Sequence, residues 1–83
     1  MIMDLEVILF AIYKERLKTN SIIVQLPENS TVEQLVNKLK NDYPQLADPE
    51  TNIVVAVNSE YSEYNLKLNE TDEICLIPPV SGG

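Results

Sequence analysis

The sequence contains no histidine, no tryptophan and only one cysteine, Cys75, among its 83 residues. The absence of histidine removes the commonest general acid–base and metal ligand of proteins. It also excludes a cysteine–histidine nucleophile pair. A single cysteine cannot form an intramolecular disulfide, so nothing in the sequence indicates an oxidising compartment. These absences argue against a self-sufficient enzyme, and we expect neither a bound metal nor a bound cofactor.

Signals for membrane insertion and secretion are also missing. Residues 1–6 lack the basic region and following long apolar stretch of a secretory signal peptide. No apolar run approaches the length that spans a membrane. We therefore expect a cytoplasmic protein that forms one domain with a small core.

Positive charge is scarce and unevenly placed. The chain has 13 acids and 6 bases, which gives a net charge of −7. Residues 1–41 hold five of each sign, whereas residues 42–83 hold eight acids and only Lys67. Nucleic-acid binding needs clustered lysine and arginine, so this balance argues against it. Two interpretations stay open: a docking surface for a basic partner, or a solvated acidic surface that maintains solubility.

Hydrophobic patterning predicts several short strands. Four segments with alternating or β-branched apolar residues are predicted as strands: residues 3–10, 21–26, 53–57 and 73–77. Residues 61–68 are ambiguous, with a short edge strand as one interpretation. The segment that holds Lys14, Arg16 and Lys18 is predicted to be a polar connection.

One helix is predicted at about residues 32–42. Both Ser30 and Thr31 fit the first position of a capping box, because Glu33 and Gln34 follow them three residues later. The segment has one apolar face at helical spacing, formed by Val32, Leu35, Val36 and Leu39. A chain with two strands, one helix and then further strands is typical of a small α+β domain, in which the helix packs across one sheet.

The last six residues, Pro78-Pro79-Val80-Ser81-Gly82-Gly83, are the most informative segment. Proline cannot donate a ladder hydrogen bond, so we expect the sheet to end there and the chain to stay extended. Glycine lacks a Cβ atom and fits a narrow channel. We predict a domain at residues 1–77 and a flexible tail at residues 78–83 that reaches roughly 20 Å. Such a tail suits chemistry on its terminal carboxylate inside another protein.

The chain resembles the small, sulfur-carrying subunits of molybdopterin synthase. Segments in order over nearly the whole chain carry this resemblance: Val7-Ile8-Leu9-Phe10-Ala11, Leu26-Pro27, Thr31-Val32 with Leu35, Tyr43-Pro44, Ala56-Val57-Asn58, Asp72-Glu73-Ile74 and Ile77-Pro78-Pro79-Val80-Ser81-Gly82-Gly83. The last segment is highly specific, and the apolar and helical pieces are weakly specific. Two departures fall in turns, because Ser59 and Thr71 stand where the family often has glycine.

The resemblance implies a ubiquitin-like β-grasp roll, with a mixed sheet covered by the main helix, and a non-catalytic, sulfur-donating role. An E1-like activating enzyme would use ATP to adenylate the carboxylate of Gly83. A sulfur donor protein would convert the adenylate to a thiocarboxylate, and no cofactor would be bound by the chain itself. The tail would insert into the large synthase subunit, where cyclic pyranopterin monophosphate receives the sulfur and becomes molybdopterin. We expect a heterotetramer, with one carrier at each end of a dimer of large subunits.

Within that role each tail residue has an expected part. Gly83 carries the sulfur and Gly82 is the slim spacer. The guide residues are Pro78, Pro79, Val80 and Ser81. An apolar patch beside the tail, around Ile77 and Val80, is the expected anchor for the large subunit.

Other interpretations remain beside this one. Thiamine-pathway sulfur carriers also end in Gly-Gly, although they are typically shorter and lack the Pro-Pro-Val-Ser approach. A ubiquitin-like modifier joined to lysine amines through Gly83 shares the adenylation step. Cys75 is expected to be a small core or interface residue, because no neighbour in sequence lowers its pKa. Tyr61 and Tyr64 fit either edge-strand packing or a docking surface.

Overall fold

The computed structural model describes residues 1–78 of the chain. This part contains a sheet of five strands. The strands and helices, in chain order, are β1 (Ile2–Leu9), α1 (Ala11–Leu17), β2 (Ser21–Pro27), α2 (Val32–Asp42), β3 (Val54–Val57), β4 (Glu60–Tyr61) and β5 (Ile74–Ile77). The predicted strands and main helix are confirmed, with ends that differ by one residue at several places.

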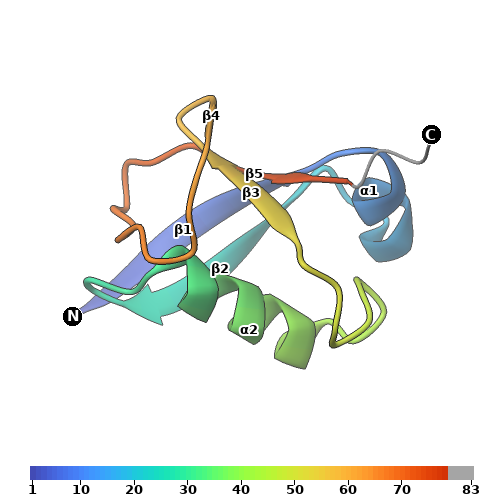
Figure 1. Cartoon of the computed structure of the whole chain (residues 1–83), viewed down its shortest axis with the longest axis horizontal. Helices are drawn as coiled ribbons and strands as arrows, with labels where there is room; N and C mark the ends of the chain where they lie inside the picture. Colours follow the sequence, from blue (N-terminus) through green and yellow to red (C-terminus); the bar gives the residue numbers. More distant parts are fainter. Residues whose placement is uncertain (79–83) are drawn as a thin grey trace.

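The sheet has the strand order β2-β1-β5-β3-β4, so the first and last strands are neighbours near its centre. The pairing of β1 with β5 is parallel, and the other pairings are antiparallel. Figure 1 shows α2 across one face of this mixed sheet and α1 beside the end of β5. The arrangement is the predicted ubiquitin-like β-grasp roll.

The core lies between the sheet and α2. Alternate residues of β1 are buried because successive side chains of a strand point to opposite faces. The buried side chains of α2 are those of its predicted apolar face, Val32, Leu35, Val36 and Leu39. They pack against inward residues of the strands, including Leu5, Val55 and Leu76, which are fully buried. Burial of these faces supplies the main driving force for folding.

Residues 11–17 form helix α1, so the prediction of a polar connection in this segment is wrong. Tyr13 from this helix is 2% exposed and joins the core, and Leu17 packs against the core one turn later. Only two of the four apolar residues in this helix, Tyr13 and Leu17, face the core, and a single pair at i, i+4 gives too little periodicity to detect in the sequence. The guanidinium of Arg16 also donates a hydrogen bond of 2.7 Å to the carbonyl of Leu46, which ties α1 to the segment after α2.

The N-terminus of α2 is held by a capping box built on Thr31, one of the two predicted hydroxyls. Its Oγ1 accepts a hydrogen bond from the N–H of Gln34, and the Gln34 side chain accepts one from the N–H of Thr31. The N–H groups of Val32 and Glu33 donate to the carbonyls of Leu66 and Tyr64, each at 2.9 Å. The free donors of the first helical turn are therefore satisfied by its own cap and by a distant loop.

The ambiguous segment 61–68 is mostly this loop. Within it only Tyr61 belongs to a strand, β4, and Lys67 forms an isolated bridge with Thr31. The Tyr64 hydroxyl donates a 2.7 Å hydrogen bond to the carbonyl of Ile53, and the ring packs against the core. Tyr64 is thus a packing residue, whereas Tyr61 is 78% exposed.

A tight turn joins β3 to β4 through Asn58 and Ser59, whose φ angles are 54° and 71°. Two consecutive positive φ values are the signature of the type I′ hairpin turn, which favours Asn-Gly. The Asn58 side chain also accepts a hydrogen bond from the N–H of Glu73 and donates one to the carboxylate of Asp72, both at 2.9 Å. Thr71, the other departure from the family pattern, has no positive φ. Asparagine tolerates positive φ better than serine does, so the turn imposes more backbone strain at Ser59 than at Asn58, and Thr71 has none of this kind.

Substitution of Ser59 by glycine is expected to stabilise the protein by about 1 kcal/mol, because glycine adopts positive φ without a Cβ clash. Thr71→Gly is the matched control, and it should be neutral or destabilising because it only adds freedom to the unfolded chain. Urea denaturation of both variants measures the free energies of unfolding. Equal effects from the two substitutions would contradict the assignment of strain to Ser59.

Candidate functional site

The face of the sheet opposite α2 carries the C-terminal strand in its middle. Strand register places Cys75 of β5 between Ile8 of β1 and Ala56 of β3. One step further along β5, Ile77 lies opposite Val54. Side chains that are paired in register share a face, so this row of apolar residues lies on the side that the main helix leaves uncovered.

Several large apolar side chains remain exposed on this face. Phe10 is 46% exposed, Val54 is 43% exposed and Tyr61 is 78% exposed. Tyr61 pairs with Ala56, and Phe10 follows β1 with extended backbone angles, which keeps it in phase with Ile8. We call the apolar residues of this face the tail-proximal patch; Phe10, Val54 and Tyr61 are its exposed members, Ile8, Cys75 and Ile77 are half-buried, and Ala56 is buried. An exposed apolar group of this kind is typical of a protein–protein interface.

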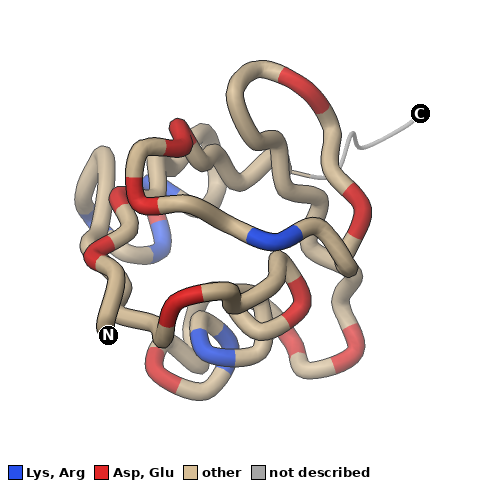
Figure 2. The backbone as a smooth tube through the Cα atoms, turned by 90° about the vertical axis from the view of Figure 1, so that its left-hand side faces the viewer, with Lys and Arg blue, Asp and Glu red and all other residues tan. Residues whose placement is uncertain are grey.

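The other half of the same face is acidic. Asp4 and Glu6 alternate with the buried residues of β1, and Glu70 and Glu73 flank them from the loop before β5. The Glu70 carboxylate accepts a 2.9 Å hydrogen bond from the N–H of Asp4, which fixes the loop to the strand. Figure 2, which views the molecule from the end that holds the N-terminus, shows acidic segments spread over several loops. The uncovered face thus combines an apolar half with an acidic half, which matches a partner with an apolar centre and basic margins.

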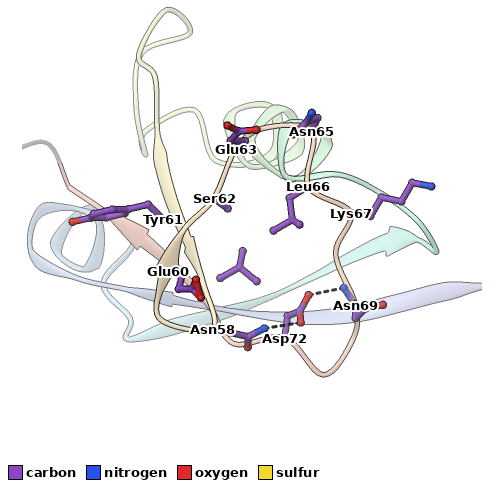
Figure 3. Close-up of a pocket in the computed structure, with 11 residues that line it drawn as sticks. Asn58, Glu60, Tyr61, Ser62, Glu63, Asn65, Leu66, Lys67, Asn69 and Asp72 are labelled. Atoms are coloured by element: carbon purple, nitrogen blue, oxygen red, sulfur yellow. Dashed lines mark hydrogen bonds between the residues drawn. The ribbon is translucent and has the colours of Figure 1, made fainter.

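A shallow hollow of about 760 Å³ lies beside β4, between the β3–β4 turn and the loop that follows. Figure 3 shows Leu66 pointing into this hollow and Tyr61 pointing away from it. The Asp72 carboxylate at its margin accepts hydrogen bonds from the side chain of Asn58 and from the N–H of Asn69. Because this carboxylate organises the loop, it is not a free acid–base group. The other two carboxylates of the hollow, Glu60 and Glu63, are exposed, so the hollow lacks the buried acid–base group that is typical of a catalytic centre.

Within residues 1–78 no three side chains of histidine, cysteine, aspartate or glutamate are grouped so that they could hold a metal ion. Neither of the helices described there is both long and apolar enough to cross a membrane.

Cys75 is half-buried in the tail-proximal patch. Burial raises the pKa of its thiol above the usual range, and the negative charge of Glu73 acts in the same direction. The thiol therefore stays protonated near neutral pH, which makes it a poor nucleophile. This agrees with the prediction of a small packing or interface residue.

The predicted site residues fall into two groups. Ile77 and Pro78 are half-buried at the end of β5, where the patch begins. The other predicted site residues, Pro79, Val80, Ser81, Gly82 and Gly83, lie outside the described residues. Sequence reasoning missed Phe10 and Val54 as members of the patch. The alternation of β1 could have indicated Phe10, but Val54 lies in an apolar run that reads as buried on both faces.

Comparison with known proteins gives a consistent assignment. The sequence profile of the ThiS family matches residues 7–83. The molybdopterin synthase sulfur carrier subunit of Dictyostelium discoideum is 43% identical over 81 residues, which cover 94% of each chain. The crystal structure of small archaeal modifier protein 1 (SAMP1) from Haloferax volcanii has a TM-score of 0.80 at 28% identity. It covers 96% of this chain and 99% of its own.

A third similarity concerns the fold alone. A chain from the complex of subunits 1 and 2 of the molybdopterin-converting factor of Helicobacter pylori has a TM-score of 0.67 at 24% identity, with both chains fully covered. The family match spans nearly the whole chain, the similarity to the D. discoideum subunit is nearly full length, and the fold is shared with solved carriers and modifiers. This chain belongs to the ThiS family and, within it, is similar to the sulfur carrier subunits of molybdopterin synthase.

Proposed function

We propose that this protein is the sulfur carrier subunit of molybdopterin synthase, and that Gly83 carries the sulfur. The relatives that share its length and family support this role. The observation that carries the proposal is structural: β5 lies near the centre of the sheet, and its end leads to Pro78 beside the tail-proximal patch. A surface of this kind holds a partner while the residues that follow enter that partner's active site.

The proposed chemistry takes place on the terminal carboxylate. A carboxylate is a poor electrophile, so its oxygen first attacks the α-phosphorus of ATP and releases pyrophosphate. Hydrosulfide from a sulfur donor then attacks the acyl carbon, and AMP leaves with the bonding electron pair. The product is an ionised thiocarboxylate, whose soft sulfur attacks a carbon of cyclic pyranopterin monophosphate and displaces an oxygen, which leaves with the bonding electron pair and takes up a proton. Hydrolysis of the resulting acyl–sulfur bond leaves the sulfur on the pterin and returns the carboxylate of Gly83.

The partners follow from what the chain lacks. It contains no histidine, and its carboxylates at Glu70 and Asp72 are engaged in loop hydrogen bonds. General acid–base groups and phosphate-binding residues are therefore assigned to the large subunit, and ATP binding to an E1-like activating enzyme. We place the reaction in the cytoplasm. We also propose a heterotetramer, with one carrier at each end of a dimer of large subunits.

The acidic half of the uncovered face would set the orientation in which a partner binds. Its exposed carboxylates, at Asp4, Glu6 and Glu73, border the tail-proximal patch on one side. Basic residues on a partner would meet these acids while an apolar centre covers Phe10 and Ile77. Apolar burial supplies most of the affinity of such an interface, and the charges mainly set its orientation and association rate.

A second function is favoured by one observation, the similarity to small archaeal modifier protein 1. In that role a lysine amine attacks the activated acyl carbon of Gly83 and forms an isopeptide bond. A thiamine-pathway carrier would deliver the sulfur to a different acceptor. The intact mass of the chain from cells distinguishes a thiocarboxylate from a conjugate, and co-purification of a pterin-synthase subunit distinguishes the two carrier pathways.

The first prediction concerns the terminus. With activating enzyme, ATP and sulfide, the chain should gain the mass of one oxygen-to-sulfur exchange, located on Gly83 by fragmentation. Adding one residue after Gly83 should abolish molybdopterin formation without changing the thermal unfolding midpoint, because the reactive carbonyl is displaced from its position in the partner. Continued molybdopterin formation by the extended chain, with the extra residue still attached, would rule out the proposed role of Gly83.

The second prediction concerns docking. Ile77→Lys should weaken binding to the large subunit by about 2 kcal/mol, roughly thirtyfold in Kd, because it places an unpaired charge in an apolar interface. Ile2→Lys is the matched control, since Ile2 lies at the opposite end of the same face and is 59% exposed. Calorimetric titration of both variants measures the difference. If both bind as tightly as the parent chain, the interface lies elsewhere.

The third prediction concerns the thiol. Cys75→Ala should retain most sulfur transfer and lose about 1 kcal/mol of stability, because a small, half-buried group is removed. Since the folded protein raises the thiol pKa, the stability from the neutral thiol is present below the unfolded pKa. It is lost as pH rises through the folded pKa. The difference between parent and variant should therefore shrink in alkaline buffer. Loss of transfer in a stably folded variant would indicate a persulfide on Cys75 instead.

A further inference from the structure

Strand β2 forms one border of the sheet, beside α2, and has a neighbour on one side only (Figure 1). Its seven residues, Ser-Ile-Ile-Val-Gln-Leu-Pro, contain no charge. The opposite border, β4, has only two residues. Proteins usually protect a long edge strand with charged residues, bulges or a covering segment. β2 shows none of these protections before Pro27, so it is a ready template for a further strand.

The free backbone groups of β2 can be assigned from its pairing with β1. The N–H of Leu9 donates to the carbonyl of Asn20, and the N–H of Glu28 donates to the carbonyl of Met1. Bonded and non-bonded residues alternate between these two points in an antiparallel pair. Ile22, Val24 and Leu26 therefore bond to β1. The residues between them direct their N–H and C=O groups to the open border: Ser21, Ile23 and Gln25.

We propose that this border pairs with β2 of a second copy of the chain, antiparallel and centred on Ile23. In this register Ile23 lies opposite its own counterpart, and Ser21 of each copy lies opposite Gln25 of the other. Each of these residue pairs forms two backbone hydrogen bonds. The carbonyl of Ser21 also accepts from the Thr19 hydroxyl at 3.1 Å, and its second lone pair remains available. A two-fold axis through the border thus satisfies every open group of the strand.

The side chains of β2 also favour pairing with a second copy of the chain. Ile23 is 59% exposed on the face opposite α2, and the pairing brings two such side chains into contact at the centre. Polar Ser21 and Gln25 flank this contact, so no charges of the same sign lie directly opposite each other. The groove at this border is lined by one ion pair, Lys38 with Asp42 at 3.0 Å, and by Asp4, whose carboxylate accepts a 2.9 Å hydrogen bond from the Gln25 side chain. The groove of each copy therefore has one net negative charge, so the self-pairing depends on the uncharged strand and on the contact between the two Ile23 side chains.

The pairing is independent of the proposed sulfur-carrier role. It uses the border formed by β2, whereas the tail-proximal patch lies over β1, β5, β3 and β4. A strand-to-strand contact of this length buries less surface than a standard stable interface, so the dimer is expected to be weak and concentration-dependent. Both copies carry a net charge of −7, so added salt should strengthen the association.

Sedimentation equilibrium of the full chain alone, from about 10 µM to about 1 mM, tests the proposal. The parent chain should pass from monomer to dimer in this range, and more completely at high salt. Ile23→Lys should weaken the association at least about tenfold by placing two like charges at the centre. Ile2→Lys is the matched control, because Ile2 is also 59% exposed but lies on β1. A parent chain that stays monomeric throughout, or equal weakening by both variants, would overturn the proposal.

Hydrogen exchange on the parent chain gives a test that needs no variant. The amides of Ile23 and Gln25 should exchange fast in dilute solution and become protected as concentration rises. The amides of Ile22 and Val24 already bond to β1 and should be protected at both concentrations, which makes them internal controls. Association without new protection at Ile23 and Gln25 would place the contact between copies elsewhere and refute the β2 pairing.

Discussion

The parallel pairing of β1 with β5 is the constraint on which the rest of this structure depends. It joins residues 7–9 to residues 74–76, so it closes only when nearly the whole chain is in place. Because both strands run in the same direction, the end of β5 lies beside the end of β1 and the start of α1. This places Pro78 at the margin of the tail-proximal patch, whose residues come from β1, β3, β4 and β5. If the last strand lay at the border of the sheet, a partner could contact neighbouring strands on only one side of the tail.

A second long-range contact holds the opposite end of the molecule. The loop after β4 supplies the carbonyls of Tyr64 and Leu66 to the first N–H groups of α2, and the Tyr64 hydroxyl binds the carbonyl of Ile53. The loop thus serves as an extension of the helix cap, although it contains almost no regular structure. This explains why a segment with strand-like composition does not become a long strand: its carbonyls are already committed to the helix. Local propensity yields here to the unsatisfied donors of a distant helix.

The parts of the fold that were predictable are those with a local signal. The capping box at Thr31 and the apolar spacing along α2 define the helix without knowledge of its surroundings. Helix α1 was not predictable, because it is set mainly by the burial of Tyr13 and by a bond from Arg16 to a residue thirty positions away. Within the tail-proximal patch, Ile77 was predicted as an anchor, an interface was one interpretation for Cys75 and Tyr61, and the alternation of β1 could have indicated Phe10. Recognising Val54 as exposed requires the register of β3 against β5, and a continuous apolar run does not contain that information.

The placement of the acids helps to explain why a chain of this kind would delegate its chemistry to its terminus. A domain with a small core cannot easily enclose a water-free pocket, and its hollow is lined by two exposed carboxylates, Glu60 and Glu63, and by Asp72, which already serves the loop. Asp72 accepts from Asn58 and Asn69, and Glu70 accepts from Asp4, so their charges stabilise loops. The remaining acids are exposed and suit the orientation of a partner. With side chains assigned in this way, the reactive group is best carried outside the domain, on a main-chain carboxylate that a larger protein can surround. The role of the fold is then to hold the last strand, β5, in the centre of the surface that the partner binds.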